Sequence, residues 1–365
     1  MFNIKNKKTV SFMMALTVFC SLLSGCGKKE VLPEDMVDVL LITDVGTVDD
    51  GSYNQGAWEG IQEYVSENPS VIAKYYQPAD TSEESYLNEI KKGVDNGAKV
   101  IVCPGSLLEE TIYKAQKTYK DVDFILLDGT PHNEDYSDET IEENVTCITF
   151  EEEEAGFLAG YAAVRDGYTN LAFMGGVPED AVIRYGYGFV QGADYASIQV
   201  GLPVTVRYMY ANTYYEDDSV EATAASWFDN GTEVIFACGG AMGKSVMRAA
   251  ENHDGKVIGV DVDQSSESET VITSAMKSLD SAVYQGIKDY YAGSFKGGEI
   301  VTFSAKESGV CLPMNTSRFT SFSETEYESI YSQLVDDIID PYSDTTVGTC
   351  EELSLVNTEV SYIVP

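Results

Sequence analysis

The chain has 365 residues, 44% of them hydrophobic and 23% charged, which is enough for one large or two medium domains with apolar cores. Its formal net charge is −37. This composition excludes a disordered chain. It also excludes nonspecific binding to nucleic acid, because neutralising phosphates needs clustered Lys and Arg side chains.

The N-terminus has the arrangement of a lipoprotein signal. Three lysines within the first eight residues precede an apolar run over 12–23, which is too short to cross a bilayer core of roughly 30 Å. Small residues then lead to a cysteine in Leu23-Ser24-Gly25-Cys26, a pattern that a lipoprotein-processing enzyme cleaves and acylates. We expect residues 1–25 to be a signal peptide, Cys26 to carry acyl chains such as palmitate, and 26–36 to be a tether. The folded part is then lipid-anchored on the extracytoplasmic face of the cell membrane. A cleaved secretory signal in which Cys26 is incidental remains an alternative with the same compartment.

Short apolar runs alternate with longer amphipathic stretches from about Val37 onward. In the first part we expect strands over 37–43, 71–75, 100–103, 124–127 and 145–150, and helices over 53–66, 82–96 and 107–119. A polar stretch over 131–144 interrupts the pattern. Strand followed by helix, repeatedly, predicts a parallel sheet with helices on its faces.

A second run of the same kind follows. Its predicted strands cover 171–174, 204–209, 234–237 and 257–260, and its predicted helices cover 151–164, 181–196, 221–228 and 241–251, with two more helices at 282–292 and 325–338. This repetition predicts an α/β chain of two doubly wound lobes joined by a hinge, the first over 37–150 and the second over 151–277. Residues 278–365 are expected to cross back and to be shared between the lobes. The ligand site of such a chain lies in the cleft where the carboxyl ends of the strands face each other.

The cysteines and histidines give little support to a metal site or to catalysis. Seven cysteines are present, and five remain once Cys20 has left with the signal and Cys26 has taken lipid, an odd number that is not a complete disulfide framework. Three of the five lie in apolar runs and are expected to be buried, inert thiols: Cys103, Cys147 and Cys238. Cys311 and Cys350 could pair. The two histidines, His132 and His253, have no Cys or carboxylate at ligand spacing, so we expect no metal, no cofactor and no enzymatic activity.

An aspartate follows each of three predicted strands: Asp44, Asp128 and Asp261. An ionised carboxylate accepts two hydrogen bonds from hydroxyl groups, each stronger than a neutral one, which suits a polyol ligand. A single aspartate in such a place is as well explained as a helix cap. Three of them on different strands, in both lobes, favour a hydroxyl-bearing ligand.

One segment nearly matches a phosphate-binding loop. The segment Cys238-Gly239-Gly240-Ala241-Met242-Gly243-Lys244-Ser245 follows a predicted strand and opens a predicted helix. A Walker A loop requires glycine where Cys238 stands. Because ATP is also scarce outside the cell, we do not expect nucleotide hydrolysis.

Two tyrosines occupy corresponding turns from strand to helix, Tyr53 in the first lobe and Tyr214 in the second. If each ring lines its side of the cleft, a flat base could stack between them, at about 1–3 kcal/mol per stack. The chain has 24 tyrosines, so surface tyrosines of no special role are the alternative.

Together these features resemble the basic membrane protein family, the purine-nucleoside-binding lipoproteins of ABC importers. The resemblance rests on the segments 49–60 (DDGSYNQGAWEG), 175–178 (GGVP), 239–241 (GGA), 258–264 (IGVDVDQ) and 273–277 (TSAMK). It implies a type I periplasmic-binding-protein fold that closes on a nucleoside, an ABC transporter permease as partner, and a monomer without catalysis. A ligand-sensing regulatory lipoprotein and a sugar-binding relative of the same fold remain alternatives.

The resemblance also implies a set of ligand-binding residues: Asp44, Tyr53, Asn54, Asp128, Tyr214, Asp261 and Lys277. Tyr53 and Tyr214 stand where the family usually has phenylalanines that sandwich the base, so stacking is retained and two hydroxyls are added. Asn54 and Asp128 would hydrogen-bond the base, and Asp261 would hold ribose hydroxyls. Asp44 and Lys277 would contribute further contacts.

Overall fold

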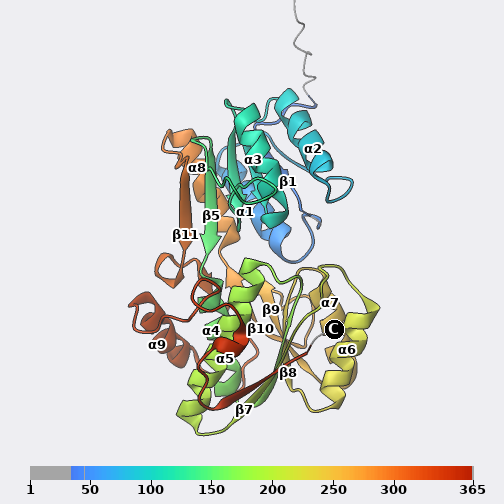
Figure 1. The fold of residues 1–365 in the computed structure, drawn as a ribbon, viewed down its shortest axis with the longest axis vertical. Coiled ribbons are helices and arrows are strands. Elements are labelled where there is room, and N and C mark those ends of the chain that lie inside the picture. Colours follow the sequence, from blue (N-terminus) through green and yellow to red (C-terminus); the bar gives the residue numbers. More distant parts are fainter. Residues whose placement is uncertain (1–33, 45, 364–365) are drawn as a thin grey trace, which may run out of the picture. The chain divides into compact units, whose positions relative to one another are not determined.

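The computed structural model describes residues 34–44 and 46–363 of the chain. The predicted signal peptide, the cysteine predicted to be acylated (Cys26) and most of the predicted tether lie outside the described residues. The described chain forms two sheets with helices packed on their faces (Figure 1).

The first sheet has six strands, and all of its pairings are parallel. Its order is β11 (Glu299–Phe303), β5 (Val145–Phe150), β4 (Asp123–Leu127), β3 (Val100–Pro104), β1 (Val39–Ile42) and β2 (Ala73–Tyr76). Its helices are α1 (Tyr53–Glu67), α2 (Glu83–Asp95), α3 (Glu109–Thr118) and α8 (Leu279–Ala292), with the short η1 (Ser106–Leu108) before α3. The central β1 and β3 are buried along their whole length, as expected for strands covered by helices on both faces.

The second sheet has seven strands, parallel except for a short antiparallel edge strand. Its order is β12 (Val310–Cys311), β10 (Val271–Lys277), β9 (Lys256–Asp261), β8 (Val234–Cys238), β6 (Asn170–Gly175), β7 (Val204–Tyr210) and β13 (Thr358–Tyr362). Its helices are α4 (Glu152–Arg165), α5 (Asp180–Val200), α6 (Asp218–Asp229), α7 (Met242–His253) and α9 (Glu324–Val335), with the short η2 (Ala305–Glu307) and η3 (Cys350–Glu352).

Glycines bring α4 and α5 into close contact. A Cβ at Gly156 or Gly160 of α4 would lie 2.1 or 2.0 Å from a carbonyl oxygen of α5. At Gly188 and Gly192 of α5, the corresponding distances to carbonyl oxygens of α4 are 1.9 and 2.0 Å. Only glycine permits this approach, which places the N-terminal turns of both helices beside the end of β10.

The chain crosses between the two sheets three times: from β5 into α4, from β10 into α8, and from β11 into η2. Figure 1 shows β11 beside β5, and α8 packs against α1, β3 and β4, so this late part of the chain completes the first lobe before returning to the second. Two side-chain contacts tie the crossings together. Thr149 Oγ1 lies 3.0 Å from Thr302 Oγ1, and Glu154 accepts a hydrogen bond of 2.6 Å from the backbone N–H of Ala305.

The prediction of two doubly wound α/β lobes is confirmed, and each predicted strand and helix has a counterpart whose ends differ by a few residues. Short strands without bounds were expected between the helices at 282–292 and 325–338, where β11 and β12 lie, whereas β10 and β13 were not predicted. The Cys311–Cys350 disulfide, which the sequence left open, is not formed, since both thiols are free. Cys311 lies in β12 opposite Met276, whereas Cys350 lies in η3 near Tyr187 of α5.

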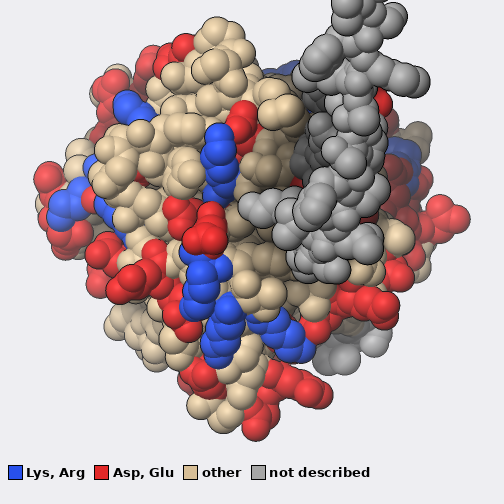
Figure 2. Space-filling view, turned by 90° about the horizontal axis from the view of Figure 1, so that it is seen from above, with Lys and Arg blue, Asp and Glu red and all other residues tan. Residues whose placement is uncertain are grey.

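Acidic side chains are spread over the face shown in Figure 2, with Lys and Arg side chains among them. Several lysines of the first lobe are paired with carboxylates. Lys91 Nζ lies 2.6 Å from Asp95, Lys92 Nζ lies 2.8 Å from Glu89, and Lys99 Nζ lies 2.7 Å from Asp38. Because a carboxylate neutralises each of these lysines, they offer little positive charge to which a polyanion such as nucleic acid could bind.

Candidate functional site

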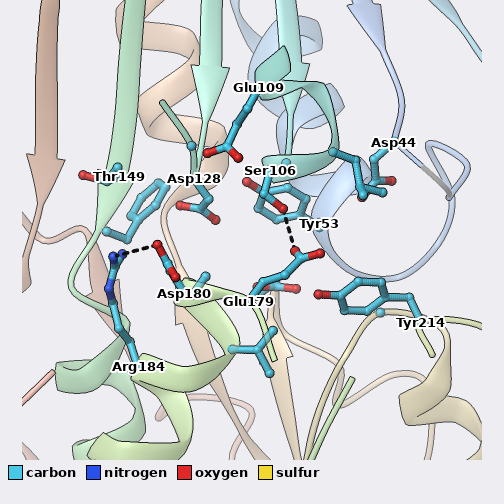
Figure 3. A pocket seen from close by; sticks show the side chains of 18 of the residues that line it. Asp44, Tyr53, Ser106, Glu109, Asp128, Thr149, Glu179, Asp180, Arg184 and Tyr214 are labelled. Carbon is cyan, nitrogen blue, oxygen red and sulfur yellow. Dashed lines mark hydrogen bonds and ion pairs between the residues drawn. The ribbon is translucent and has the colours of Figure 1, made fainter. Parts of the chain in front are cut away.

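A cavity of about 1160 Å³ opens at the carboxyl ends of the strands and is lined by residues of both lobes (Figure 3). All seven ligand-binding residues predicted from the sequence line it: Asp44, Tyr53, Asn54, Asp128, Tyr214, Asp261 and Lys277. Their individual roles in binding stay predictions. Parallel strands bring their carboxyl ends to one edge of a sheet, which is why residues far apart in the chain meet here.

Lys277, the last residue of β10, lies at the centre of a buried charge cluster. Its ammonium donates a hydrogen bond to Asp128 Oδ2 and lies 3.4 Å from Glu152 Oε1 and 3.6 Å from Asp261 Oδ1. Burial alone would lower the pKa of Lys277, but the three carboxylates outweigh that effect and hold the pKa above its ordinary value. Lys277 is therefore a fixed positive charge at physiological pH, although only 4% of the residue is exposed.

Two of the predicted aspartates have unusual backbone conformations. Asp128, which follows β4, has φ of 50°, and Asp261, which ends β9, has φ of 66°. Both values lie in the left-handed region, which non-glycine residues adopt at a cost and which is common at ligand sites. This conformation turns both carboxylates toward Lys277 from opposite lobes.

Hydrogen bonds between the lobes hold the cleft closed. Ser52 Oγ donates to Asp261 Oδ2 at 2.6 Å, and Gln264 Nε2 donates to the carbonyl oxygen of Gly51 at 2.8 Å. On the other side of the cavity, Ser106 Oγ donates to Glu179 Oε2 at 2.6 Å (Figure 3). Each bond joins a residue of the first lobe to a residue of the second.

The amide of Asn54 holds the loop that follows β1. Its Nδ2 donates to Asp44 Oδ1 at 2.7 Å and to Asp50 Oδ2 at 2.8 Å, and its Oδ1 accepts from the N–H of Asp44 at 3.2 Å. All hydrogens of the amide are engaged within the loop. In this arrangement Asn54 positions Asp44 at the cavity wall, and a ligand could bond directly to Asn54 only through the second lone pair of Oδ1 unless one of these bonds is exchanged.

The rings of Tyr53 and Tyr214 line the cavity from different lobes (Figure 3). Tyr53 begins α1, and Tyr214 lies in the turn between β7 and α6. Position 176 must be glycine, because a Cβ there would lie 2.6 Å from the ring of Tyr214. Burial raises the pKa of both phenols, and nearby carboxylates raise it further, so both side chains are neutral.

The sequence analysis missed two charged residues of this cluster. Glu152 is fully buried and lies between Lys277 and Arg184, whose Nη1 is 3.4 Å from Glu152 Oε2. Arg184 in turn donates from Nε to Asp344 Oδ1 at 2.6 Å. The acidic run at the start of α4 is typical of a helix N-terminus, which does not by itself reveal that one of its carboxylates is buried. The apolar run that follows it at once, Ala155 to Ala163, was the signal that this end of the helix is buried.

The buried carboxyl of Glu153 should make the stability of the fold depend on pH. Its Oε2 is buried without a hydrogen-bond partner among the described residues, and burial raises the pKa of its carboxyl to about 8. A carboxyl whose pKa is raised in the folded state stabilises the fold relative to its ionised form as long as it is protonated. This contribution to the free energy of unfolding is fully present below about pH 4.5 and is lost as the pH rises through 8. We therefore expect Glu153→Gln to raise the free energy of unfolding by about 1–3 kcal/mol at pH 9 and to change little at pH 4.5.

Thermal unfolding of the wild type and Glu153→Gln between pH 4.5 and 9 tests this expectation. Glu328→Gln, at an exposed position of α9, serves as the control and should follow the wild type at every pH. A Glu153→Gln protein whose stability differs from the wild type by the same amount at both ends of the range would contradict it.

Across the described residues, no group of His, Cys, Asp and Glu side chains is placed to hold a metal ion. Between residues 34 and 363, Val45 aside, no helix is long and apolar enough to cross a membrane. Each imidazole is already engaged: His132 lies against Glu109 and Asn133, and His253 against Asp229.

Comparisons with known proteins agree with this architecture. A chain from Lactococcus lactis subsp. cremoris described as "ABC transporter nucleoside-binding protein BmpA" is 26% identical over 362 residues, which cover 92% of this chain and 97% of the relative. "Basic membrane protein D" of Borreliella burgdorferi is 30% identical over 330 residues, covering 89% and 91% of the two chains.

Among solved structures, an ABC transporter solute-binding protein from Aeropyrum pernix has a TM-score of 0.72 at 22% identity, over 86% of this chain and 95% of that one. A transcriptional activator of the comK gene from Bacillus halodurans has a TM-score of 0.64 at 21% identity, over 82% and 96%. At these identities the likeness shows the fold. The model of the Bmp family, described as "ABC transporter substrate-binding protein PnrA-like", matches residues 37–345. The chain therefore belongs to the Bmp family of ABC transporter substrate-binding proteins.

Proposed function

We propose that this protein is a lipid-anchored, extracytoplasmic binding protein that captures a purine nucleoside in its cleft and presents it to the permease of an ABC importer. The observation that carries the proposal is the pairing of two features of one cavity. Tyrosine rings from both lobes line it, and the aspartates beside Lys277 supply carboxylates for hydroxyl groups. The printed name of the Lactococcus relative, a nucleoside-binding protein, supports the same ligand class.

We assign the parts of a nucleoside to the parts of the cavity by their chemistry. Tyr53 and Tyr214 stack on the flat base. Asp261 and Lys277 hold the ribose hydroxyls, since a carboxylate accepts and an ammonium donates strong hydrogen bonds. The carboxylate of Asp128 hydrogen-bonds the base. Closure around the ligand is a population shift toward the state in which both lobes touch it.

Two other functions share this fold. A sugar-binding relative would use the aspartates and would not need both rings. A regulatory lipoprotein would bind the same nucleoside without a permease. The two rings on opposite walls of one cavity favour a ligand with a flat base over a free sugar.

A calorimetric titration tests the proposal. The full chain in mild detergent, unfolded and refolded to remove any carried ligand, is titrated with inosine, guanosine, adenosine, cytidine, ribose and a hexose. We expect saturable binding of purine nucleosides at micromolar affinity or tighter, corresponding to about −8 to −12 kcal/mol, and none of the free sugars. Binding of sugars alone, or of nothing in the panel, would refute the nucleoside assignment.

The charge of the cavity predicts rejection of phosphorylated ligands. Twelve of its lining residues are Asp or Glu, and two are Lys or Arg. Both cations are already paired, Lys277 with three carboxylates and Arg184 with Glu152 and Asp344. A phosphate group entering the cavity would therefore face uncompensated negative charge.

We expect inosine 5′-monophosphate to bind at least about 100-fold more weakly than inosine, in a competition titration against inosine. The difference should shrink as salt is added, because salt screens the charges near the opening. Equal affinity for the two compounds would show that a positive group of the cavity is free to bind phosphate.

A further inference from the structure

The hydroxyl of Tyr185 is buried at the cavity wall without a hydrogen-bond partner. Tyr185 lies in the second turn of α5, is 1% exposed, and lines the cavity. Its hydroxyl is among the few buried polar atoms that have no partner among the described residues. Since buried polar groups are nearly always paired in folded proteins, this hydroxyl needs an explanation.

The ammonium of Lys277 lies beside the ring of Tyr185 and beside two side chains of the first lobe, Tyr53 and Asp128. The Nζ atom of Lys277 is 4.7 Å from the ring centre of Tyr53 and 5.6 Å from that of Tyr185, and it binds Asp128 Oδ2. Tyr53 and Asp128 also lie within hydrogen-bonding reach of each other. The Tyr185 hydroxyl is therefore the polar group that the second lobe places beside these side chains without a partner among the described residues.

The chemistry of this place selects a neutral hydroxyl. A ligand hydroxyl can donate to Asp261, the carboxylate assigned to the sugar, and accept from the Tyr185 hydroxyl at the same time. An anionic group would be repelled by Asp128, Asp261 and Glu152, all of which surround the ammonium. An apolar group would leave the Tyr185 hydroxyl buried and unpaired.

We propose that the Tyr185 hydroxyl is a specificity-determining contact that recognises a hydroxyl group of the ligand's sugar beside Lys277. The inference rests on the proposed function, which it deepens by naming a residue that discriminates between sugars differing in one hydroxyl. Tyr185 carries this role because its unpartnered hydroxyl lies beside Lys277 and belongs to the second lobe, so its bond to a ligand forms only when the cleft is closed.

The test compares Tyr185→Phe with a matched control, Tyr86→Phe. Tyr86 in α2 also has a buried hydroxyl without a partner, but it does not line the cavity. The full chain of each variant is titrated in a calorimeter with inosine, its 2′-, 3′- and 5′-deoxy forms, hypoxanthine and ribose, and its thermal unfolding is measured without ligand.

We expect Tyr185→Phe to bind inosine about tenfold more weakly than the wild type, while one deoxyinosine, which already lacks the recognised hydroxyl, binds both proteins equally. Without ligand, neither substitution should lower Tm, since each removes an unpaired polar group. Tyr86→Phe should bind every ligand as the wild type does.

Two results would overturn the inference: unchanged inosine affinity in Tyr185→Phe, or an equal loss for every ligand accompanied by a lower Tm, which would mark the hydroxyl as structural. A wild type that binds ribose but no nucleoside would refute the proposed function alone, and the comparison would then be made on ribose. A wild type that binds nothing in the panel would refute both.

Discussion

Replacing Lys277 by methionine is expected to lower the free energy of unfolding by about 3–5 kcal/mol, because removing one partner of a buried ion cluster leaves the other charges uncompensated. Methionine has a similar length and fills the space of the lysine stem, so the loss reports the charge and not a cavity. The side chain is fully enclosed, and three carboxylates face it at hydrogen-bond or ion-pair distance. The corresponding fall in Tm is on the order of 10 °C.

The loss should depend on pH. Burial already raises the pKa of Glu152 and of Asp261, and Lys277 opposes that rise in both. Without the lysine their pKa rises further, so the variant retains more of its stability at low pH and loses it as the pH increases. We expect a larger fall in Tm at pH 8 than at pH 5. Adding Glu152→Gln to the variant should recover part of the loss.

Thermal and urea unfolding of the three proteins measure this effect. Lys99→Met is the control, since its ammonium is half exposed, with 52% of the side chain accessible, and its pair with Asp38 is on the surface. Surface pairs contribute at most about 1 kcal/mol. A Lys277→Met protein no less stable than Lys99→Met would show that the carboxylates around residue 277 do not depend on its charge.

The second large effect concerns the two rings of the cavity. Replacing Tyr53 or Tyr214 by alanine is expected to weaken nucleoside binding at least tenfold each, because each stack contributes about 1–3 kcal/mol. In the double variant the losses combine to at least about 100-fold. Phenylalanine at either position keeps the stacking surface, so it should retain most of the affinity.

Titration with inosine and guanosine measures these affinities, and near-ultraviolet spectra check that each variant is folded. Tyr342→Ala, an exposed tyrosine that does not line the cavity, should bind as the wild type does. If the double alanine variant keeps wild-type affinity, the base does not lie between these rings. If phenylalanine loses as much as alanine, the hydroxyls and not the rings bind the ligand.

Both effects depend on the closed arrangement of the lobes. The cation of the cluster lies at the end of β10, where the chain crosses from the second lobe into α8, and its strongest partner, Asp128, belongs to the first lobe. The bond from Ser52 to Asp261 and the bond from Ser106 to Glu179 also span the cleft. A ligand bound among these groups would favour closure by making contacts to both lobes at once.

The sequence by itself determined the two-lobe α/β fold and predicted seven residues that line one cavity. Alternation of short apolar runs with amphipathic stretches is a local signal, since it follows from the periods of strands and helices. The aspartates at the carboxyl ends of β1, β4 and β9 and the tyrosines at matching turns could be located because parallel strands present their carboxyl ends at one edge. Element ends differed by a few residues, as the last turn of a helix depends on its neighbours.

The tertiary structure alone decided which of these residues touch. Glu152 and Arg184 were not predicted, because whether a charged residue in a helix faces solvent or a buried lysine depends on packing between α4, α5 and β10. Asn54 is engaged with the loop that carries Asp44, and Cys311 and Cys350 lie in separate places, neither of which spacing along the chain reveals. The unpaired hydroxyl of Tyr185 likewise exists only in the folded chain, since burial and the lack of a partner are properties of its surroundings and not of its sequence.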